Sequence, residues 1–453
     1  MPKKATQQLD LTLGSPLRLL IRFCIPIFIG NIFQQLYNMV DTIIVGRFIG
    51  AEALAAVGSC APVYQIFLGL NSGLALGSGI ILSQLIGAKE LKRIRNTIYN
   101  SLLFLSLIAI IISIISIIAA PQLLRLFMVP ENILSDAVIY TRVVLAGCLG
   151  LSLYNGMAES LRALGDSQTP LYFLLIASLL NVGLDLLFVA VFHWGIFGAA
   201  LATIIAQFIS AFLCITYATH RFSYYHFAKA DRVWSWETVK LIIKTGLPLS
   251  LQNAMIGFSG AVLQGFVNSF GAKFVAANTV VTRFDNLQNM PYYSFASALS
   301  VFTAQNMGAG RLERVKTSYR ITLGLALGYS LFVLAIGWLA GAFFSSWFVA
   351  DPSIRQTAAT GIRTISCGTL ALGMIYSHRS ILNGSGDTFF SMISGFVEII
   401  GRIGFASFFI FVAKTGYVGI WYAMIANWLL TGFIVFLRYT GGNWQKKGIT
   451  NSN

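Results

Sequence analysis

The sequence predicts an all-α integral membrane protein, with twelve transmembrane helices in two six-helix lobes related by a pseudo-twofold axis along the membrane normal. Of the 453 residues, 56% are hydrophobic and only 10% are charged, whereas a soluble protein carries about 25% charged residues. Apolar segments of membrane-spanning length follow one another along the chain, and the second half repeats the pattern of the first.

The apolar segments are long enough to cross a bilayer, which takes about 20 helical residues. In the first half they cover 17–46, 53–85, 98–120, 136–160, 170–192 and 195–218. In the second half they cover 240–269, 274–305, 318–346, 356–382, 388–412 and 416–438. We therefore expect an N-lobe at 1–218, a cytoplasmic linker at 219–239 and a C-lobe at 240–453.

The balance of charge indicates the orientation. The net charge is +15, which in a soluble chain would suggest nucleic acid as a partner. In a membrane protein, however, Lys and Arg collect in cytoplasmic loops. With the N-terminus inside, the inner segments hold 22 Lys and Arg, including Lys3, Lys4 and Arg379, and the outer loops hold 7. We expect both termini in the cytoplasm, and the lipid bilayer rather than nucleic acid as partner.

The internal repeat appears when the chain is shifted by 221 residues. The matches include Gly50-Ala51 with Gly271-Ala272, Gln84-x-x-Gly87-Ala88 with Gln305-x-x-Gly308-Ala309, Gly147 with Gly368, and Leu161-x-x-x-Gly165-Asp166 with Leu382-x-x-x-Gly386-Asp387. Chance matching of apolar residues would not align so many Gly, Gln and Asp. Six helices per half is an even number, so both halves insert with the same orientation. A cleft between two such bundles favours a transporter.

Motifs of soluble enzymes are missing from the sequence. It contains no Walker A loop, no H-E-x-x-H, no G-x-S-x-G and no CxxC pair. We expect no enzymatic activity and no cofactor, and an ion gradient rather than ATP as the driving force. The five widely spaced cysteines, Cys24, Cys60, Cys148, Cys214 and Cys367, are interpreted as small buried apolar residues.

Carboxylates inside membrane spans are the strongest functional candidates, because each costs at least about 2.5 kcal/mol to insert. Asp41 follows a polar stripe on the first span, Asn31, Gln34, Gln35 and Asn38. Asp185 lies one helical turn after Asn181, so the two share a face. One carboxylate and one amide oxygen could hold H⁺ or Na⁺ there. The alternative is a structural hydrogen-bonding seam between helices.

The second half lacks equivalents of these acids. The shift places Arg402 at the position of Asn181 and Ala406 at that of Asp185, which suggests a site specific to the first half. Glu398 and Arg402 are four residues apart, and we expect them to form a neutral structural pair. Arg283 and Asp285 are two residues apart and either pair across helices or line the cleft.

The motifs together resemble a known family. The run Pro26…Gln34-Gln35-Leu-Tyr37-Asn38-Met-Val-Asp41-x-x-x-Val45-Gly46, the two Gln-x-x-Gly-Ala elements and Leu161-Arg-Ala-x-Gly165-Asp166 resemble the multidrug and toxic compound extrusion (MATE) transporters. The resemblance implies export of organic cations by H⁺ or Na⁺ antiport across a bacterial cytoplasmic membrane. It also implies a coupling-cation site at Asp41, Asn155, Asn181, Asp185 and Thr203 in the branch with an N-lobe site, where Pro26 bends the first helix.

Polar residues in both halves are expected around a substrate cleft. Gln34, Tyr37, Asn38, Arg283 and Asp285 are candidates for lining the substrate cleft. We expect the coupling ion to bind Asp41 and Asp185 and so release a lipophilic cation, with the protein working as a monomer. A flippase for a lipid-linked precursor, on a related two-lobe fold, is the nearest alternative. A membrane scaffold or receptor without transport is another.

Overall fold

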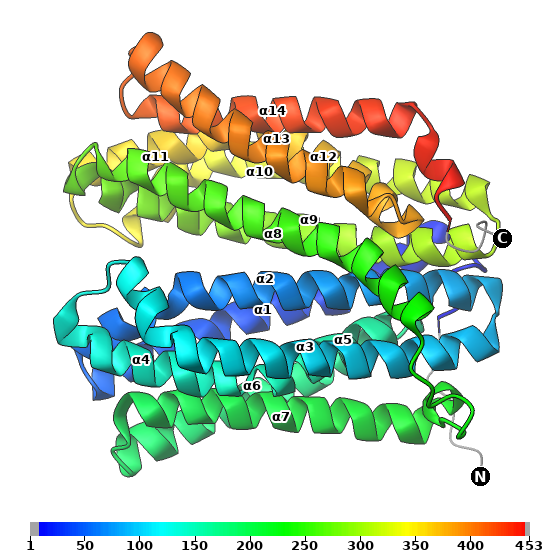
Figure 1. Cartoon of the computed structure of the whole chain (residues 1–453). Coiled ribbons are helices and arrows are strands. Elements are labelled where there is room, and N and C mark those ends of the chain that lie inside the picture. The colour runs from blue at the N-terminus through cyan, green and yellow to red at the C-terminus, as the bar shows by residue number, and fades with distance from the viewer. Residues whose placement is uncertain (1–8, 449–453) are drawn as a thin grey trace. The chain divides into compact units, whose positions relative to one another are not determined.

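The computed structural model describes residues 9–448, and within this range the chain is helical without any strand. Lys3 and Lys4, which enter the charge count, lie outside the described residues, as do the outermost ends of the two predicted lobes. Figure 1 shows the helices of each half lying side by side along their length.

The helices of the first half begin and end close to the predicted spans. They are α1 Pro16–Phe48, α2 Ala51–Ala88, α3 Leu91–Leu126, α4 Glu131–Ala146, α5 Cys148–Ala163, α6 Gln168–Asp185 and α7 Gly195–Arg221. The π-helical segment η1, Leu186–Val191, continues α6, and the short 3-10 turn η2, Ser223–Tyr225, follows α7.

The second half has the same order of elements. They are α8 Trp236–Asn268, α9 Ala272–Gly308, α10 Leu312–Ser346, α11 Pro352–Ser366, α12 Thr369–Ser385, α13 Thr388–Ser407 and α14 Val418–Thr440. The π-helical segment η3, Phe408–Val412, continues α13, and the 3-10 turn η4, Asn443–Lys446, follows α14.

The predicted fold class is confirmed once two broken spans are taken into account. In the described chain, eight helices are long and apolar enough to cross a membrane, and the pairs α4–α5 and α11–α12, bent by 43° and 47°, raise this to ten. The remaining two spans are α8 and α9, which have 33 and 37 residues and fall outside these ten. The breaks fall at Gly147 and Gly368, which the repeat aligns.

The backbone repeats as closely as the sequence does. Five pairs of residues separated by 221 positions have a positive φ angle in both halves, and they are Gly50 and Gly271, Lys89 and Gly310, Gly165 and Gly386, His193 and Lys414, and Gly195 and Gly416. A positive φ is uncommon outside glycine, so its recurrence at His193 (55°) and Lys414 (51°) shows that each half forms the same sharp turn before its last helix.

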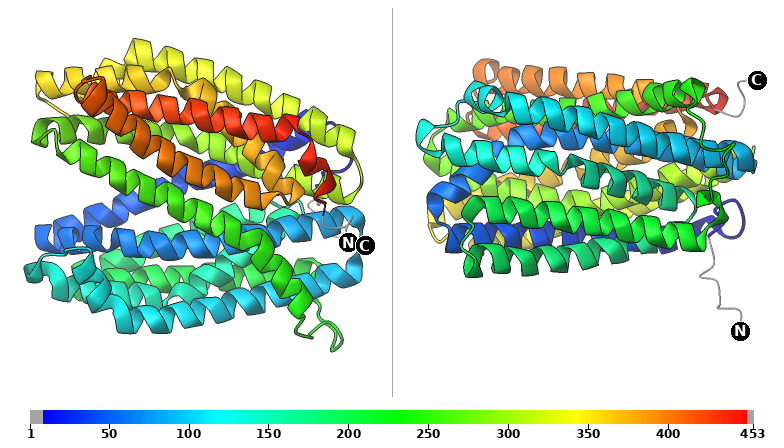
Figure 2. Two further views of the ribbon diagram at one scale, coloured as in Figure 1. Left: turned by 45° about the horizontal axis from the view of Figure 1, so that its top comes forward. Right: turned by 60° about the horizontal axis from the view of Figure 1, so that its bottom comes forward.

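Helix packing also follows the repeat. In the first half α2 packs on α3 and α5, and α7 packs on α5 and α6. The second half repeats these contacts, with α9 on α10 and α12, and α14 on α12 and α13. Figure 2 shows α13 and α14 (orange to red) side by side. The core of the second half is built around Trp421, which is fully buried and donates from Nε1 to Oδ1 of Asn278 at 3.0 Å.

The chain divides into two compact units, and the division passes through two helices. Of the described residues, unit 1 holds 9–10 and Ile25–Ser250, and unit 2 holds Leu11–Cys24 and 251–448. The first part of α1 thus belongs to unit 2, and the first part of α8 belongs to unit 1. Both changes of unit occur within two residues of a proline, Pro26 and Pro248.

Polar contacts fix the segments that lead into α1 and α8. Within unit 2, Oε1 of Gln305 accepts from the backbone N–H of Leu11 at 3.1 Å, and Nη1 of Arg314 donates to the carbonyl of Gly14 at 2.9 Å. Within unit 1, Nδ2 of Asn100 donates to the carbonyl of Val233 at 3.0 Å. The repeated Gln-x-x-Gly-Ala element therefore holds, in its second copy, the chain that enters α1.

Candidate functional site

Two carboxyl groups of unit 1 face each other in the structure. Asp41 lies in the second half of α1, and Asp185 is the last residue of α6, where the helix widens into the π-helical segment η1. The two carboxyl groups lie close enough to interact with each other electrostatically. Asp185 is fully buried, with 0% of its surface exposed. In the described chain no group donates to Oδ1 of Asp41 or to either carboxylate oxygen of Asp185.

Asn181 adds an unsatisfied amide to this pair. It lies one turn before Asp185 on α6, is 2% exposed, and neither Nδ2 nor Oδ1 has a hydrogen-bond partner among residues 9–448. Buried polar atoms in proteins are nearly always hydrogen-bonded. Carboxylate and amide oxygens are suitable ligands for a small cation or a proton. The three side chains therefore provide the elements of a cation site.

Two tyrosines lie near the carboxyl pair. Tyr37, one turn before Asp41 on α1, and Tyr140, on α4, lie close enough to both carboxyl groups to interact with them electrostatically. Tyr140 did not emerge from the sequence. The repeat could have indicated it, because its counterpart in the second half is Gly361, and the acids of the site lack counterparts in the same way.

Asn155 and Thr203, the other predicted members of the site, have hydrogen bonds elsewhere. Asn155 donates from Nδ2 to Oδ1 of Asn71 on α2 at 2.9 Å, and Asn71 is a buried residue that the sequence did not suggest. Thr203 donates from Oγ1 to the carbonyl of Ala199 on its own helix at 3.2 Å. The structure thus brings Asp41 and Asp185 close together and places Asn181 one turn before Asp185 on α6. The membership of Asn155 and Thr203 in the site stays a prediction.

The residues predicted to line a substrate cleft fall into both units. In unit 1, Gln34 and Asn38 are exposed on α1, and the half-buried Tyr37 hydrogen-bonds to Gln34. Gln34 and Asn38 therefore do not belong to a buried seam, while Asn31 and Gln35 are half-buried, so the structural alternative for the rest of the stripe stays open. The helix α1 is continuous through Pro26, so the predicted bend at this residue stays a prediction.

In unit 2, two amides of α9 satisfy the carboxylate of Asp285. Arg283 is exposed. Oδ1 of Asp285 accepts from Nε2 of Gln288 at 2.8 Å and from Nδ2 of Asn289 at 3.1 Å. Among residues 9–448, Asp285 has no ion pair.

The prediction that Glu398 pairs with Arg402 is wrong. Oε1 of Glu398 instead accepts from Nη2 of Arg379, on α12, at 2.6 Å, and both side chains are nearly buried. Arg379 was counted among the cytoplasmic cations, but only 8% of its surface is exposed, and Nε also donates to Oγ of Ser394. Residues four apart on one helix are close enough to pair, but Glu398 binds Arg379 on the neighbouring helix instead.

One further expectation is corrected in part. Cys24, Cys60, Cys148 and Cys214 are buried as predicted, but Cys367 is exposed. It lies at the break between α11 and α12, directly before Gly368. A helix that ends at a bend leaves its last turn without the neighbours that bury a mid-helix residue.

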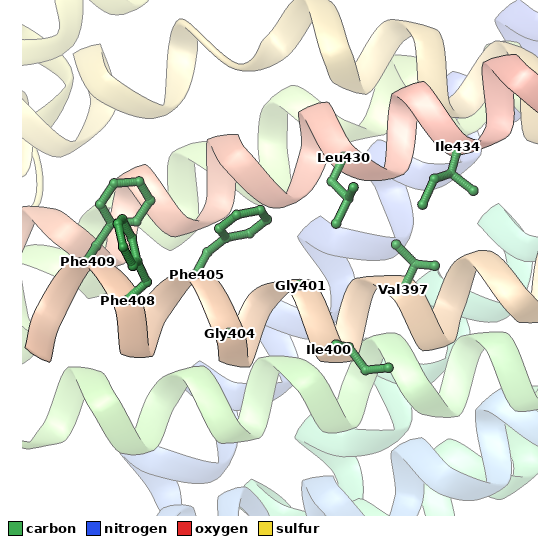
Figure 3. A pocket seen from close by; sticks show the side chains of 9 residues that line it. All are labelled: Val397, Ile400, Gly401, Gly404, Phe405, Phe408, Phe409, Leu430 and Ile434. Atoms are coloured by element: carbon green, nitrogen blue, oxygen red, sulfur yellow. The ribbon is translucent and has the colours of Figure 1, made fainter. Parts of the chain in front are cut away.

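A groove between α13 and α14 lacks the groups that an ion would need (Figure 3). It has a volume of about 610 Å³. Its lining consists of apolar side chains and glycines, namely Val397, Ile400, Gly401, Gly404, Phe405, Phe408, Phe409, Leu430 and Ile434. The candidate cation site is therefore the carboxylate pair of unit 1.

Comparison with known proteins gives matches over most of the chain. The family model described as MatE matches residues 26–187 and 248–407, once in each half of the chain. The chain is 29% identical to the probable multidrug resistance protein YpnP of Bacillus subtilis (strain 168), covering 96% of this chain and 97% of the relative. It is 26% identical to the probable multidrug resistance protein YoeA of the same strain, covering 94% of each chain.

A solved structure described as the outward-facing conformation of a multidrug resistance MATE family transporter of the MOP superfamily has the same fold. Its TM-score is 0.91 at 26% identity, covering 98% of this chain and 100% of that one. Members of this family are transporters and not enzymes. Two copies of the family model on two six-helix halves, together with relatives that align over almost their whole length, show that the chain belongs to the MATE family.

Proposed function

We propose that the chain is a secondary active transporter that exports lipophilic organic cations from a bacterial cell in exchange for H⁺ or Na⁺. The observation that carries this proposal is the facing pair Asp41 and Asp185 beside the unpaired amide of Asn181. The names of the relatives, probable multidrug resistance proteins, support the substrate class.

The carboxyl pair supplies a reason for ion coupling. Two ionised carboxylates cannot remain side by side in a buried place without a cation between them, since their repulsion is weakly screened there. Asp41 and Asp185 therefore hold either a proton or Na⁺ in one state and attract a cationic drug in the other. Binding of the ion neutralises the pair, changes the packing of α1 against α6, and releases the drug. The lobes then expose the site to the other side by alternating access.

We also propose where the protein lies in the cell. The protein spans the cytoplasmic membrane as a monomer, with both termini in the cytoplasm. Its N-lobe covers 1–218, its linker 219–239 and its C-lobe 240–453. Exchange of one monovalent ion for one monovalent drug would be electroneutral. A second coupling ion would add about 2.3 kcal/mol of driving force per 100 mV.

The test is ethidium efflux from energised bacterial cells that express the wild type, Asp41→Asn or Asp185→Asn at equal membrane levels. We expect efflux by the wild type and at least a tenfold loss in either variant, on the order of 1.4 kcal/mol of coupling. Asp136→Asn, which removes an exposed carboxylate on α4, is the matched control and should retain efflux. Retained efflux in both site variants would exclude the carboxylate pair as the coupling site.

The coupling ion is identified in a second experiment. The purified protein is reconstituted into liposomes and given either a pH gradient or a Na⁺ gradient, with ethidium as the transported probe. Uptake driven by only one gradient names the ion. Transport that needs neither gradient would contradict antiport, and absence of transport by the wild type would favour a lipid flippase or a non-transporting receptor.

A further inference from the structure

The groove between α13 and α14 contains a gap at Gly401. Val397 and Phe405 of α13 point toward α14, and Leu430 and Ile434 of α14 point toward α13 (Figure 3). Gly401 lies one turn after Val397 and one turn before Phe405, so it belongs to the same row on α13. The row is therefore interrupted at a residue without a side chain, and this interruption contributes to the groove volume of about 610 Å³.

An unsatisfied amide lies directly beside this gap. A Cβ atom placed on Gly401 would lie 2.3 Å from Oδ1 of Asn427 on α14. Asn427 is 0% exposed, and neither its Nδ2 nor its Oδ1 has a hydrogen-bond partner among residues 9–448. Thr431, one turn later, is also fully buried, and its Oγ1 has no partner in the same range. Since buried polar atoms are nearly always hydrogen-bonded, the groove at Gly401 adjoins polar groups that the described chain leaves unsatisfied.

The repeat indicates that the gap and the amide are specific to unit 2. A shift of 221 residues places Leu180 at the position of Gly401 and Ala206 at that of Asn427. Unit 1 therefore has a long side chain where unit 2 has the gap, and a methyl group where unit 2 has the amide. The equivalent helices α6 and α7 pack together with this leucine and alanine. Packing of the helix pair thus does not require the glycine and the amide.

The groove opens toward the bilayer. Thr388–Val412, which is α13 with its π-helical continuation, and Val418–Thr440, which is α14, are both apolar enough to cross a membrane. Ile400 and Phe408, which line the groove, are 71% and 50% exposed. None of the lining residues is charged. A molecule that enters from the bilayer therefore meets apolar and aromatic walls.

We propose that this groove is a binding site for an uncharged aromatic molecule that dissolves in the bilayer and carries a carbonyl group, with Nδ2 of Asn427 as the hydrogen-bond donor. Ligand pockets commonly have volumes of about 300–1,000 Å³ and apolar, aromatic walls with a few polar groups. Phe405, Phe408 and Phe409 supply the aromatic contacts. An occupant that lies against Gly401 is separated from the amide only by the backbone of a residue without a side chain.

This binding is independent of the proposed cation exchange. The groove and its amide belong to unit 2, whereas the carboxylate pair belongs to unit 1. An uncharged occupant does not compete with a coupling ion for a carboxylate. The proposed site can therefore be tested by binding alone.

The test is photolabelling of the purified full-length protein in phosphatidylcholine vesicles. The probe is para-benzoylbiphenyl, an uncharged aromatic ketone whose carbonyl accepts a hydrogen bond and, when irradiated, attaches to a neighbouring C–H group. Mass spectrometry of peptides measures the labelling of α13 and α14 relative to α3, where Ile114, Ile115 and Ile118 form an exposed apolar surface. We expect α13 and α14 to be labelled at least about tenfold more than α3.

Three variants change the groove and one serves as a control. Gly404→Leu fills the groove, because a Cβ atom there would meet no heavy atom within 4 Å, and should lower the labelling to the level of α3. Gly328→Leu on α10, where a Cβ atom also meets nothing, is the matched control and should have no effect. Asn427→Ala should lower the labelling about fivefold, the effect of one hydrogen bond. Gly401→Leu/Asn427→Ala gives unit 2 the pair found in unit 1 and should lower the labelling to the level of α3.

A second probe separates the amide from the cavity. Trifluoromethyl-iodophenyl diazirine is uncharged and aromatic but has no carbonyl group. We expect this probe to label the groove as well, and Gly404→Leu to remove that labelling. Asn427→Ala should change its labelling by less than about twofold. Melting curves are recorded for every variant, and if Gly404→Leu does not fold, Gly401→Leu/Asn427→Ala supplies the same comparison.

The results decide between an occupied site and a surface covered by lipid. Labelling by the ketone that Gly404→Leu abolishes, and that Asn427→Ala lowers for the ketone alone, supports the proposal. Labelling no stronger than that of α3 would mean that phospholipid chains fill the groove, and it overturns the proposal. Labelling that persists in Gly404→Leu, or an equal fall for both probes in Asn427→Ala, also overturns it.

Discussion

Arg379 of α12 and Glu398 of α13 form an ion pair at 2.6 Å, with only 10% and 6% of their side chains exposed. Nε of Arg379 also donates to Oγ of Ser394 at 3.0 Å, so the guanidinium is held from two sides. A buried pair of this kind is costly to break by removing one partner, because the other charge stays behind without compensation. It thereby fixes how α12 packs on α13.

We expect Glu398→Gln alone to lower the free energy of unfolding by about 3–5 kcal/mol. The double variant Arg379→Met/Glu398→Leu should recover most of that loss, since it leaves no charge without a partner. Thermal unfolding in detergent of the wild type, the two single variants Arg379→Met and Glu398→Leu, and the double variant gives the coupling energy between the two side chains. A double variant as unstable as the sum of the single variants would show that the two side chains act independently.

Asn181→Leu separates a functional role from a structural one. The amide is buried and has no hydrogen-bond partner in the described chain, and an unsatisfied buried group costs about 1–3 kcal/mol. If Asn181 serves the ion, the variant should be as stable as the wild type or more stable, while ion-driven efflux falls. Both properties are measured for the variant and the wild type, stability by a melting curve and transport by ethidium efflux. Lower stability with normal efflux would point to a structural amide instead.

Gly361 should not tolerate a methyl group. A Cβ atom there would lie 2.5 Å from the side chains of Trp421 and Val281, and Trp421 is fixed by its hydrogen bond to Asn278. We expect Gly361→Ala to destabilise the protein by about 1–3 kcal/mol through overpacking. Gly324→Ala on α10, where a Cβ atom would have no heavy atom within 4 Å, should be neutral or stabilising by up to about 1 kcal/mol. Equal melting temperatures for the two variants would contradict this contrast.

The start of α11 should respond to pH through Asp351. Its Oδ1 accepts from Oγ and the backbone N–H of Ser353, each at 2.8 Å, and these hydrogen bonds hold the pKa of the carboxyl below its usual range. A lowered pKa in the folded state means that the contribution is present above the unfolded pKa of about 3.9 and is lost as the pH falls through the folded value.

Asp351→Ala should therefore melt at a lower temperature than the wild type near pH 7, with the difference shrinking below about pH 4. Asp351→Asn can still accept these hydrogen bonds, so it should show a smaller loss and little dependence on pH. A difference between the wild type and Asp351→Ala that stays constant down to pH 3 would exclude this account of the cap.

Most of the fold was predictable because the bilayer imposes length and hydropathy on each span. The segment predicted at 170–192 covers all but the first two residues of α6 and the whole of its π-helical continuation, and the change in hydrogen-bonding pattern was missed. The apolar segments predicted at 240–269 and 274–305 correspond to α8 and α9, although neither helix is among those that are long and apolar enough by themselves to cross a membrane. The bends at Gly147 and Gly368 were not predicted, because glycine is common inside membrane helices and its presence alone does not mark a break.

The part of the site that was predictable is the part that depends on residue spacing within one helix. Asp185 and Asn181 share a helix face because of their spacing, and the absence of both from the second half singled them out. Contacts between helices were not predictable in this way. The partner of Glu398 is on α12, and the partner of Asn155 is on α2. Such partners depend on how the helices rotate about their axes, which a single sequence does not determine.

The change of unit within α1 has a consequence for how the protein is made. Residues Leu11–Cys24 belong to unit 2, whose other described members begin at residue 251, and their hydrogen bonds run to Gln305 and Arg314. A chain synthesised from its N-terminus thus places the first turns of α1 in the membrane long before their partners leave the ribosome. Contacts so distant in sequence form slowly. The opening of the first helix is therefore among the last parts of the molecule to reach its final packing, and until then its polar backbone groups depend on lipid headgroups or water.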